Sequence, residues 1–100
     1  MKIEILQTKG VLELLLFLKD KFEGKQKIEM RMESGLTINA SVKGFNILLK
    51  NGFLKMIKKK KGKELYTLNK KGLEIALKLQ EALVLIDALD ENFLEFHYED

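Results

Sequence analysis

Five lysines lie within six residues, and no other part of the chain is so densely charged. They are Lys58, Lys59, Lys60, Lys61 and Lys63. Ammonium groups neutralise phosphates, so a cluster of this kind can bind a polyanion such as a nucleic acid. The alternative is a solvated turn whose lysines bind nothing. Because like charges this close repel one another, we favour polyanion binding.

A second set of residues precedes the lysine cluster and could contact bases. It consists of Thr37, Asn39, Ala40, Lys43, Gly44, Asn46 and Lys50. An asparagine amide can pair with adenine through two hydrogen bonds, and a lysine can reach guanine or phosphate. Ala40 and Gly44 are small enough to let a helix approach DNA closely, although tight packing inside the protein would also explain Gly44. This segment and the lysine cluster contain no arginine, which favours binding dominated by the phosphate backbone.

The remaining chemistry-bearing residues give little reason to expect catalysis. The chain has no cysteine, and its single histidine, His97, lies in an acidic tail. One histidine beside flexible carboxylates is a poor metal site. Phosphate-binding glycine motifs are missing, and no nucleophile stands beside a base. We therefore expect no catalytic residue, no metal and no cofactor.

Charge divides the chain into a basic part and an acidic part. Residues 43–71 hold ten lysines and one acidic residue, whereas residues 73–100 hold one lysine and eight acidic residues. This asymmetry predicts a polyanion-binding region joined to a solvated acidic one. The longest apolar run, residues 14–18, is far shorter than the roughly 20 residues of a membrane span, so we expect no membrane partner.

These side chains must be positioned by helices and a hairpin. Helical spacing predicts one helix from a cap at Thr8 to Lys21 or Phe22, and a short one over residues 28–34. A third begins with Thr37 or Asn39 as its cap and ends near Lys50. Two apolar runs joined by a glycine-containing turn, residues 53–57 and 64–68, predict a β-hairpin.

On the third helix, the helical wheel separates two faces. The apolar face carries Ile38, Val42, Phe45 and Leu49, with Ser41 and Leu48 beside it. The opposite face carries Ala40, Lys43, Gly44, Ile47 and Lys50, with Asn39 and Asn46 at the boundary. We expect this opposite face to be exposed, so that its small and polar residues can enter a major groove.

A long final helix is predicted from a cap at Asn69. Its apolar residues alternate in steps of four and three, the heptad spacing of a coiled coil. They are Ile75, Leu79, Ala82, Ile86, Leu89, Phe93 and Phe96. A second apolar stripe lies beside them, and a chain of 100 residues has little left to cover both. We therefore expect one stripe to pair with a second copy of the chain.

Three stretches give the chain a resemblance to the winged helix-turn-helix DNA-binding superfamily. They are Gly35-Leu36-Thr37, Leu48-Leu49-Lys50-Asn51-Gly52-Phe53-Leu54, and Tyr66-Thr67-Leu68-Asn69-Lys70-Lys71-Gly72. The last is similar to the segment that closes the wing in MarR-like and PadR-like regulators, with Asn69 where those families usually have threonine. The architecture of the final helix resembles small archaeal winged-helix proteins that dimerise through a coiled coil.

The resemblance implies an α+β, mostly α fold in one domain, residues 1–100. Residues 8–69 would form the helix-turn-helix and the wing, and residues 70–96 the dimerisation helix. It implies a cytoplasmic, nucleoid-associated homodimer that binds double-stranded DNA, as a transcriptional regulator or a small chromatin-like protein. The alternative is a winged-helix module that binds other proteins through its acidic C-terminal helix. The sequence does not indicate an effector.

Overall fold

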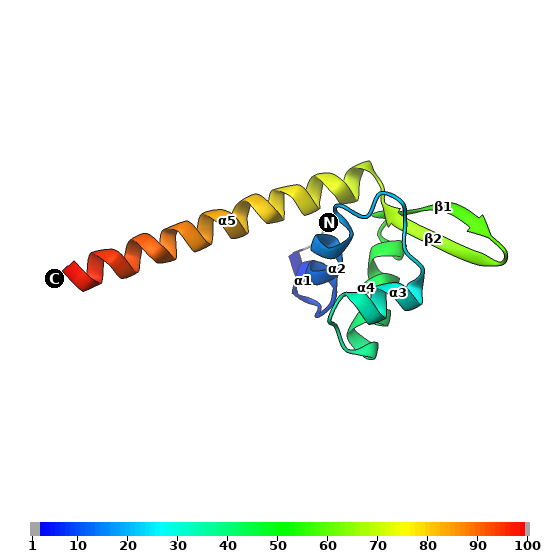
Figure 1. The fold of residues 1–100 in the computed structure, drawn as a ribbon, viewed down its shortest axis with the longest axis horizontal. Coiled ribbons are helices and arrows are strands. Elements are labelled where there is room, and N and C mark those ends of the chain that lie inside the picture. Colours follow the sequence, from blue (N-terminus) through cyan, green and yellow to red (C-terminus); the bar gives the residue numbers. More distant parts are fainter. Residues whose placement is uncertain (1–2, 100) are drawn as a thin grey trace.

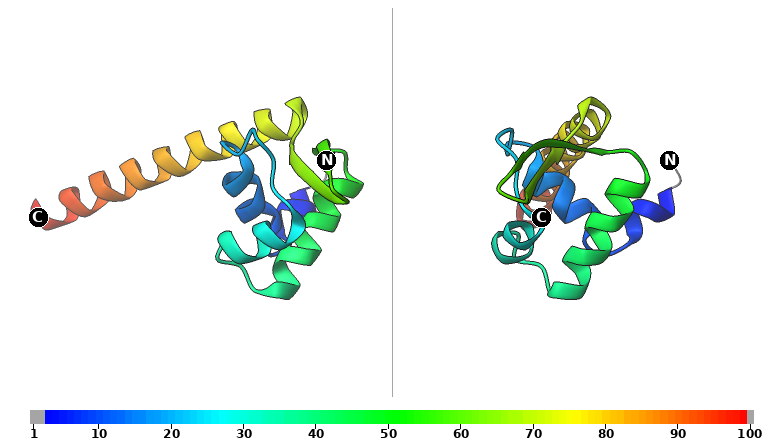
Figure 2. Two further views of the ribbon diagram at one scale, coloured as in Figure 1. Left: turned by 45° about the vertical axis from the view of Figure 1, so that its right-hand side comes forward. Right: turned by 90° about the vertical axis from the view of Figure 1, so that its right-hand side faces the viewer.

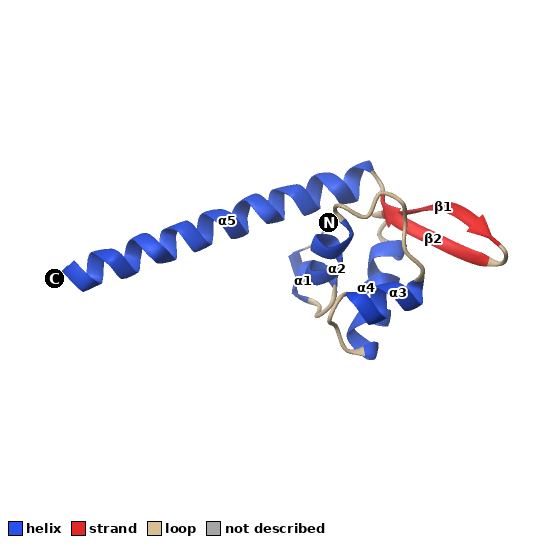
Figure 3. Ribbon diagram, in the orientation of Figure 1, coloured by secondary structure: helices blue, strands red, loops and turns tan. Residues whose placement is uncertain are grey.

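The computed structural model describes the backbone of residues 3–99 and the side chains of residues 4–57 and 61–88. Five helices and one antiparallel hairpin follow one another along the chain (Figures 1 and 3). Their bounds are α1 (Ile3–Gln7), α2 (Val11–Leu18), α3 (Lys27–Glu33), α4 (Ile38–Lys50), β1 (Leu54–Lys60), β2 (Lys63–Leu68) and α5 (Lys70–Glu99). This order confirms the mostly α winged-helix fold.

The hydrophobic core surrounds α2. Both α4 and α5 pack against this helix, so it buries apolar residues on more than one side, as its composition predicts. Its fully buried side chains are Val11, Leu14, Leu15 and Leu18. The core is completed by Met30 of α3, Leu48 of α4 and Phe53, which precedes β1.

The N-terminal region differs from the prediction of one helix that begins after Thr8. α2 begins at Val11 with Gly10, whose φ is 100°, as its cap in place of Thr8, and the additional helix α1 precedes it. A Cβ at Gly10 would overlap the carbonyl oxygen of Ala40, so only glycine fits there. α2 also ends at Leu18, earlier than predicted, and Phe22 lies beyond it as an exposed residue.

The turn between α3 and α4 follows the predicted signals closely. Gly35 has a φ of 79°, which glycine adopts without strain, and it redirects the chain. Of the two possible caps, Thr37 is the one used: its hydroxyl accepts a hydrogen bond from the backbone N–H of Ala40 at 3.2 Å. Capping satisfies one of the free N–H groups at the start of α4.

The hairpin of β1 and β2 forms the wing, residues 54–68. Lys60 stands opposite Lys63, so the turn consists of Lys61 and Gly62 alone. Both have positive φ, 51° and 77°, which identifies a type I′ turn suited to twisted strands. The wing is fixed to the body on its β2 side, where the backbones of Lys25 and Tyr66 form two hydrogen bonds.

The long helix α5 begins where the wing ends. The Asn69 side chain accepts a hydrogen bond from the backbone N–H of Gly72 at 2.8 Å, which confirms Asn69 as the cap. The first turns pack on the body, where Ala76 is fully buried. Beyond them α5 leaves the body as one unbroken helix, in the direction opposite to the wing (Figures 1 and 2). The molecule is therefore elongated, measuring 62 × 25 × 25 Å.

Candidate nucleic-acid interface

The orientation of α4 decides which residues can meet a ligand. Asn39, Lys43, Asn46 and Lys50 are exposed, as predicted. The exposed surface also carries apolar residues that the helical wheel had assigned to the inner face: Ile38, Val42 and Leu49 are 58%, 51% and 44% exposed. We call Asn39, Val42, Lys43, Asn46, Leu49 and Lys50 the α4 surface.

The predicted exposure of Ala40 and Gly44 is wrong. Both are buried, because α4 crosses the start of α2 at very short range. A Cβ on Gly44 would lie 2.7 Å from the carbonyl carbon and oxygen of Gly10, well inside van der Waals contact. Small residues are therefore required here for helix packing. Ala40 and Gly44 leave the candidate interface, and Ile47, also expected to be exposed, is partly buried against the core.

The wing presents positive charge beside α3 and α4. Lys55, Lys61 and Lys63 are exposed. The backbones of residues 58–60 lie on β1, and the side chains of Lys58, Lys59 and Lys60 lie outside the described residues.

Glu64, the only acidic residue of segment 43–71, is held within the wing. Its carboxylate accepts a hydrogen bond from the Tyr66 hydroxyl. This bond, together with burial, raises the pKa of Tyr66. In the strand register Glu64 stands opposite Lys59, so its charge opposes that of one wing lysine.

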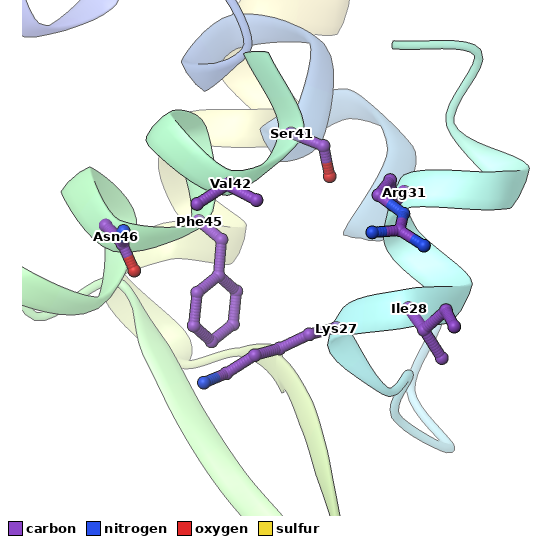
Figure 4. A pocket seen from close by; sticks show the side chains of 7 residues that line it. All are labelled: Lys27, Ile28, Arg31, Ser41, Val42, Phe45 and Asn46. Carbon is purple, nitrogen blue, oxygen red and sulfur yellow. The ribbon is translucent and has the colours of Figure 1, made fainter. Parts of the chain in front are cut away.

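A cleft of about 270 Å³ separates α3 from α4 (Figure 4). Lys27, Ile28 and Arg31 line it from α3, and Ser41, Val42, Phe45 and Asn46 line it from α4. Sequence reasoning missed Lys27 and Arg31. The available signal was that Arg31 is the chain's single arginine and precedes the turn into α4 by one helical turn.

Lys27 connects the cleft to the wing. Its ammonium nitrogen lies 5.1 Å from the centroid of the Phe45 ring, within the range of a cation–π contact. The same lysine lines a second hollow between α3 and the wing, together with Lys63 and Glu64. Positive charge therefore continues from α4 across the start of α3 to the wing.

Lys25 lies close to this surface, but its positive charge is offset by ion pairs with two glutamates. Its ammonium nitrogen lies 2.9 Å from a Glu33 carboxylate oxygen and 3.9 Å from one of Glu29. The hydrogen bond to Glu33 raises the pKa of Lys25. We therefore leave Lys25 out of the interface.

On α5, the predicted heptad stripe splits into two parts. Ile75 and Leu79 are partly buried against the core of their own domain. Ala82 and Ile86 are exposed, and so are the neighbouring apolar residues Leu83, Val84 and Leu85. The side chains of Leu89, Phe93 and Phe96 lie outside the described residues, as does that of His97.

The described part of the chain holds neither a metal-ligand cluster nor a membrane-spanning helix. Within it, no three His, Cys, Asp or Glu side chains come together as metal ligands would. No helix in this part combines the length and apolar character that crossing a membrane requires.

Comparison with known proteins identifies the fold. No family model matches the chain, and neither does any curated protein sequence. The crystal structure of SSV1 F-93 is similar, with a TM-score of 0.64 and 19% identity over 80% of this chain and 91% of that one. Sso10a-2, a DNA-binding protein from Sulfolobus solfataricus, is similar with a TM-score of 0.69 and 17% identity over 86% of this chain and 90% of that one. These matches do not extend to MarR-like or PadR-like regulators; what the three chains share is the winged-helix fold.

Proposed function

We propose that the protein binds double-stranded DNA, with α4 in the major groove and the wing on the phosphate backbone. The observation that carries this proposal is the run of exposed positive charge from Lys43 and Lys50 on α4, past Lys27, to Lys61 and Lys63 on the wing. An exposed helix face beside a basic hairpin fits a duplex, whose major groove is wide enough for one helix. The DNA-binding neighbour of the same fold, Sso10a-2, supports the proposal.

The second part of the proposal is a homodimer formed through α5. Ala82 and Ile86 continue a spacing of four and three residues, and a partner helix with the same spacing fits it best. The described residues 80–88 of α5 are all exposed, so their own domain leaves the seam open. Two copies would then carry two α4 helices, as dimeric helix-turn-helix proteins do when they bind two half-sites.

A transcriptional regulator and an architectural DNA protein both fit this proposal. The alternative function, a protein-interaction module, would use the acidic α5 rather than the basic surface. A protein-interaction module should not bind duplex DNA even at low salt. Titration with DNA therefore distinguishes the two functions.

The direct test is fluorescence anisotropy with a labelled duplex and two matched variants. Lys43→Ala combined with Lys50→Ala removes two exposed cations from the α4 surface. Each lost phosphate contact should weaken binding roughly tenfold near 0.1 M salt. Lys78→Ala removes an exposed cation from α5 and serves as the control. Equal affinities for the double variant and the control would contradict the proposed docking face.

A further inference from the structure

The α4 surface contains a repeat. Asn39, Val42 and Lys43 recur as Asn46, Leu49 and Lys50, so the pattern asparagine, two residues, aliphatic residue, lysine occurs twice with a period of seven. All six side chains are exposed. The intervening residues, among them Ala40, Ser41 and Gly44, face the body of the protein.

Seven residues are almost two turns of an α-helix, so equivalent residues of the two units lie within about 20° of each other around the axis. The α4 surface therefore consists of three rows parallel to the helix. Asparagines form the middle row, with lysines on one side and the aliphatic residues on the other. Figure 4 shows Val42 and Asn46 on α4, where both line the cleft, and both side chains are exposed.

The asparagines of the repeat differ from the two asparagines that flank helices. Asn51 donates a hydrogen bond to the Ile47 carbonyl oxygen at 2.7 Å, and Asn69 bonds both Gly52 and Gly72. Among the described residues, neither Asn39 nor Asn46 has a side-chain hydrogen bond to the protein. Both amides of the repeat are therefore available to a ligand.

Each unit has the chemistry of an A·T reader. In the major groove adenine offers one acceptor and one donor that match an asparagine amide, and thymine offers a methyl group that matches an aliphatic side chain. Within a unit the two side chains are three residues apart, or about 4.5 Å along the axis, compared with about 3.4 Å for one base-pair step. The lysine on the far side of the amide can reach the phosphates that border the groove.

The period of the repeat matches a simple interval in DNA. Seven residues advance a helix by about 10.5 Å, and three base-pair steps advance a duplex by about 10.2 Å, so the two intervals match when α4 lies along the duplex axis. We propose that α4 reads two A·T-containing steps three base pairs apart, by pairing Asn39 and Asn46 with adenine and by packing Val42 and Leu49 on thymine methyl groups. This inference rests on the proposed DNA binding and adds its base specificity.

The test compares duplexes of one length that differ only in the interval between two A·T-containing steps, on a G·C background. Intervals of two, three and four base pairs are measured by anisotropy, together with a duplex of G·C pairs alone. We expect the interval of three to bind most tightly. Its preference over the all-G·C duplex should reach roughly 5- to 150-fold for each asparagine that pairs with adenine.

Modified bases then assign the contacts atom by atom. Deoxyuridine in place of thymidine removes only the methyl group and should weaken wild-type binding roughly fourfold per contact. At the step that Val42 contacts, the same replacement should not weaken binding by Val42→Ala. In place of adenine, 7-deazaadenine removes the N7 acceptor and should weaken the wild type but not the double variant Asn39→Ala and Asn46→Ala. Lys55→Ala, which changes an exposed wing residue, should weaken binding to all duplexes equally.

The outcomes separate this inference from the proposed function. Equal binding to all intervals, or tightest binding to G·C pairs through the lysines, would overturn the inference while DNA binding stands. Failure to bind any duplex at low salt would overturn the proposed function itself. All substituted side chains are exposed, so thermal melting of each variant should match the wild type and exclude misfolding as the cause.

Discussion

Two glycines determine which residues of α4 reach solvent. Gly10 and Gly44 bring the start of α2 and the middle of α4 together at a distance that no side chain tolerates. This contact turns Ala40 and Gly44 inward and leaves the asparagines and lysines of α4 outward. The face of α4 that a ligand can reach is therefore determined by two buried glycines that cannot themselves contact the ligand.

Replacing Gly44 with alanine tests this contact. In an ordinary helix interior, the change would stabilise the protein by about 1 kcal/mol through helix propensity. Here the added Cβ meets backbone atoms that cannot move aside, so we expect a net loss of about 1–3 kcal/mol in the free energy of unfolding. Urea denaturation measures it.

Asn46→Ala is the matched control for this substitution, because it lies on the exposed side of the same helix. It should change the free energy of unfolding by no more than about 0.5 kcal/mol. A Gly44→Ala protein as stable as this control would contradict the close crossing of α2 and α4.

The elements around α4 were largely predictable from local signals. Thr37 and Asn69 are caps as predicted, and the turn glycine of the wing marks the hairpin correctly. The exposed face of α4 was not predictable, because a wheel assigns apolar residues such as Val42 to the core. The face of α4 that turns toward the core is instead set by the contact between Gly44 and Gly10, which lies more than 30 residues earlier in the sequence. The start of α2 was misplaced for the same reason, because its cap is Gly10, which packs against Ala40, and not Thr8.

How the wing is attached to the body can be tested at Thr67. This buried residue donates its hydroxyl hydrogen to the Lys21 carbonyl oxygen at 2.8 Å, across 46 positions of sequence. Thr67→Val keeps the shape and removes the bond. We expect a loss of about 1 kcal/mol, since that carbonyl retains a second hydrogen bond from Gly24.

Thr67→Ser, which keeps the hydroxyl and loses a methyl group, provides the comparison for the valine variant. Hydrogen exchange should show faster opening of the amide of Lys25, which pairs with Tyr66, only in Thr67→Val. Equal protection of that amide in the wild type and in Thr67→Val would mean that this bond does not hold the wing.

The two ends of the molecule carry opposite charge. The wing and α4 carry the positive charge, whereas the acidic α5 extends away from them (Figure 1). The sequence predicted this division from charge alone. Of the residues that the sequence assigned to a dimer seam, Ile75 and Leu79 are partly buried against the core of their own domain, and the exposed residues begin at Ala82.

The dimer proposal predicts the effect of a charge placed in that seam. Ile86 is 51% exposed in the single chain, so Ile86→Lys should leave the monomer folded. In a dimer it would bury an ammonium group at a cost of several kcal/mol and shift the protein to monomer. Analytical ultracentrifugation at a concentration on the order of 10 µM would detect the shift. Asp87→Lys, on an exposed neighbouring position outside the seam, should remain dimeric. A wild-type protein that is already monomeric would refute the seam.

The basic surface of α4 and the wing is proposed to bind DNA phosphates. The most direct measurement is the dependence of duplex affinity on salt for the wild type, for Lys61→Gln combined with Lys63→Gln, and for Lys78→Gln as control. Each lysine that contacts a phosphate contributes about 0.9 to the slope of log affinity against log salt, so the double variant should lose up to about 1.8 per protomer. Its melting temperature should stay unchanged, because both side chains are exposed. An unchanged slope in a folded double variant would contradict the claim.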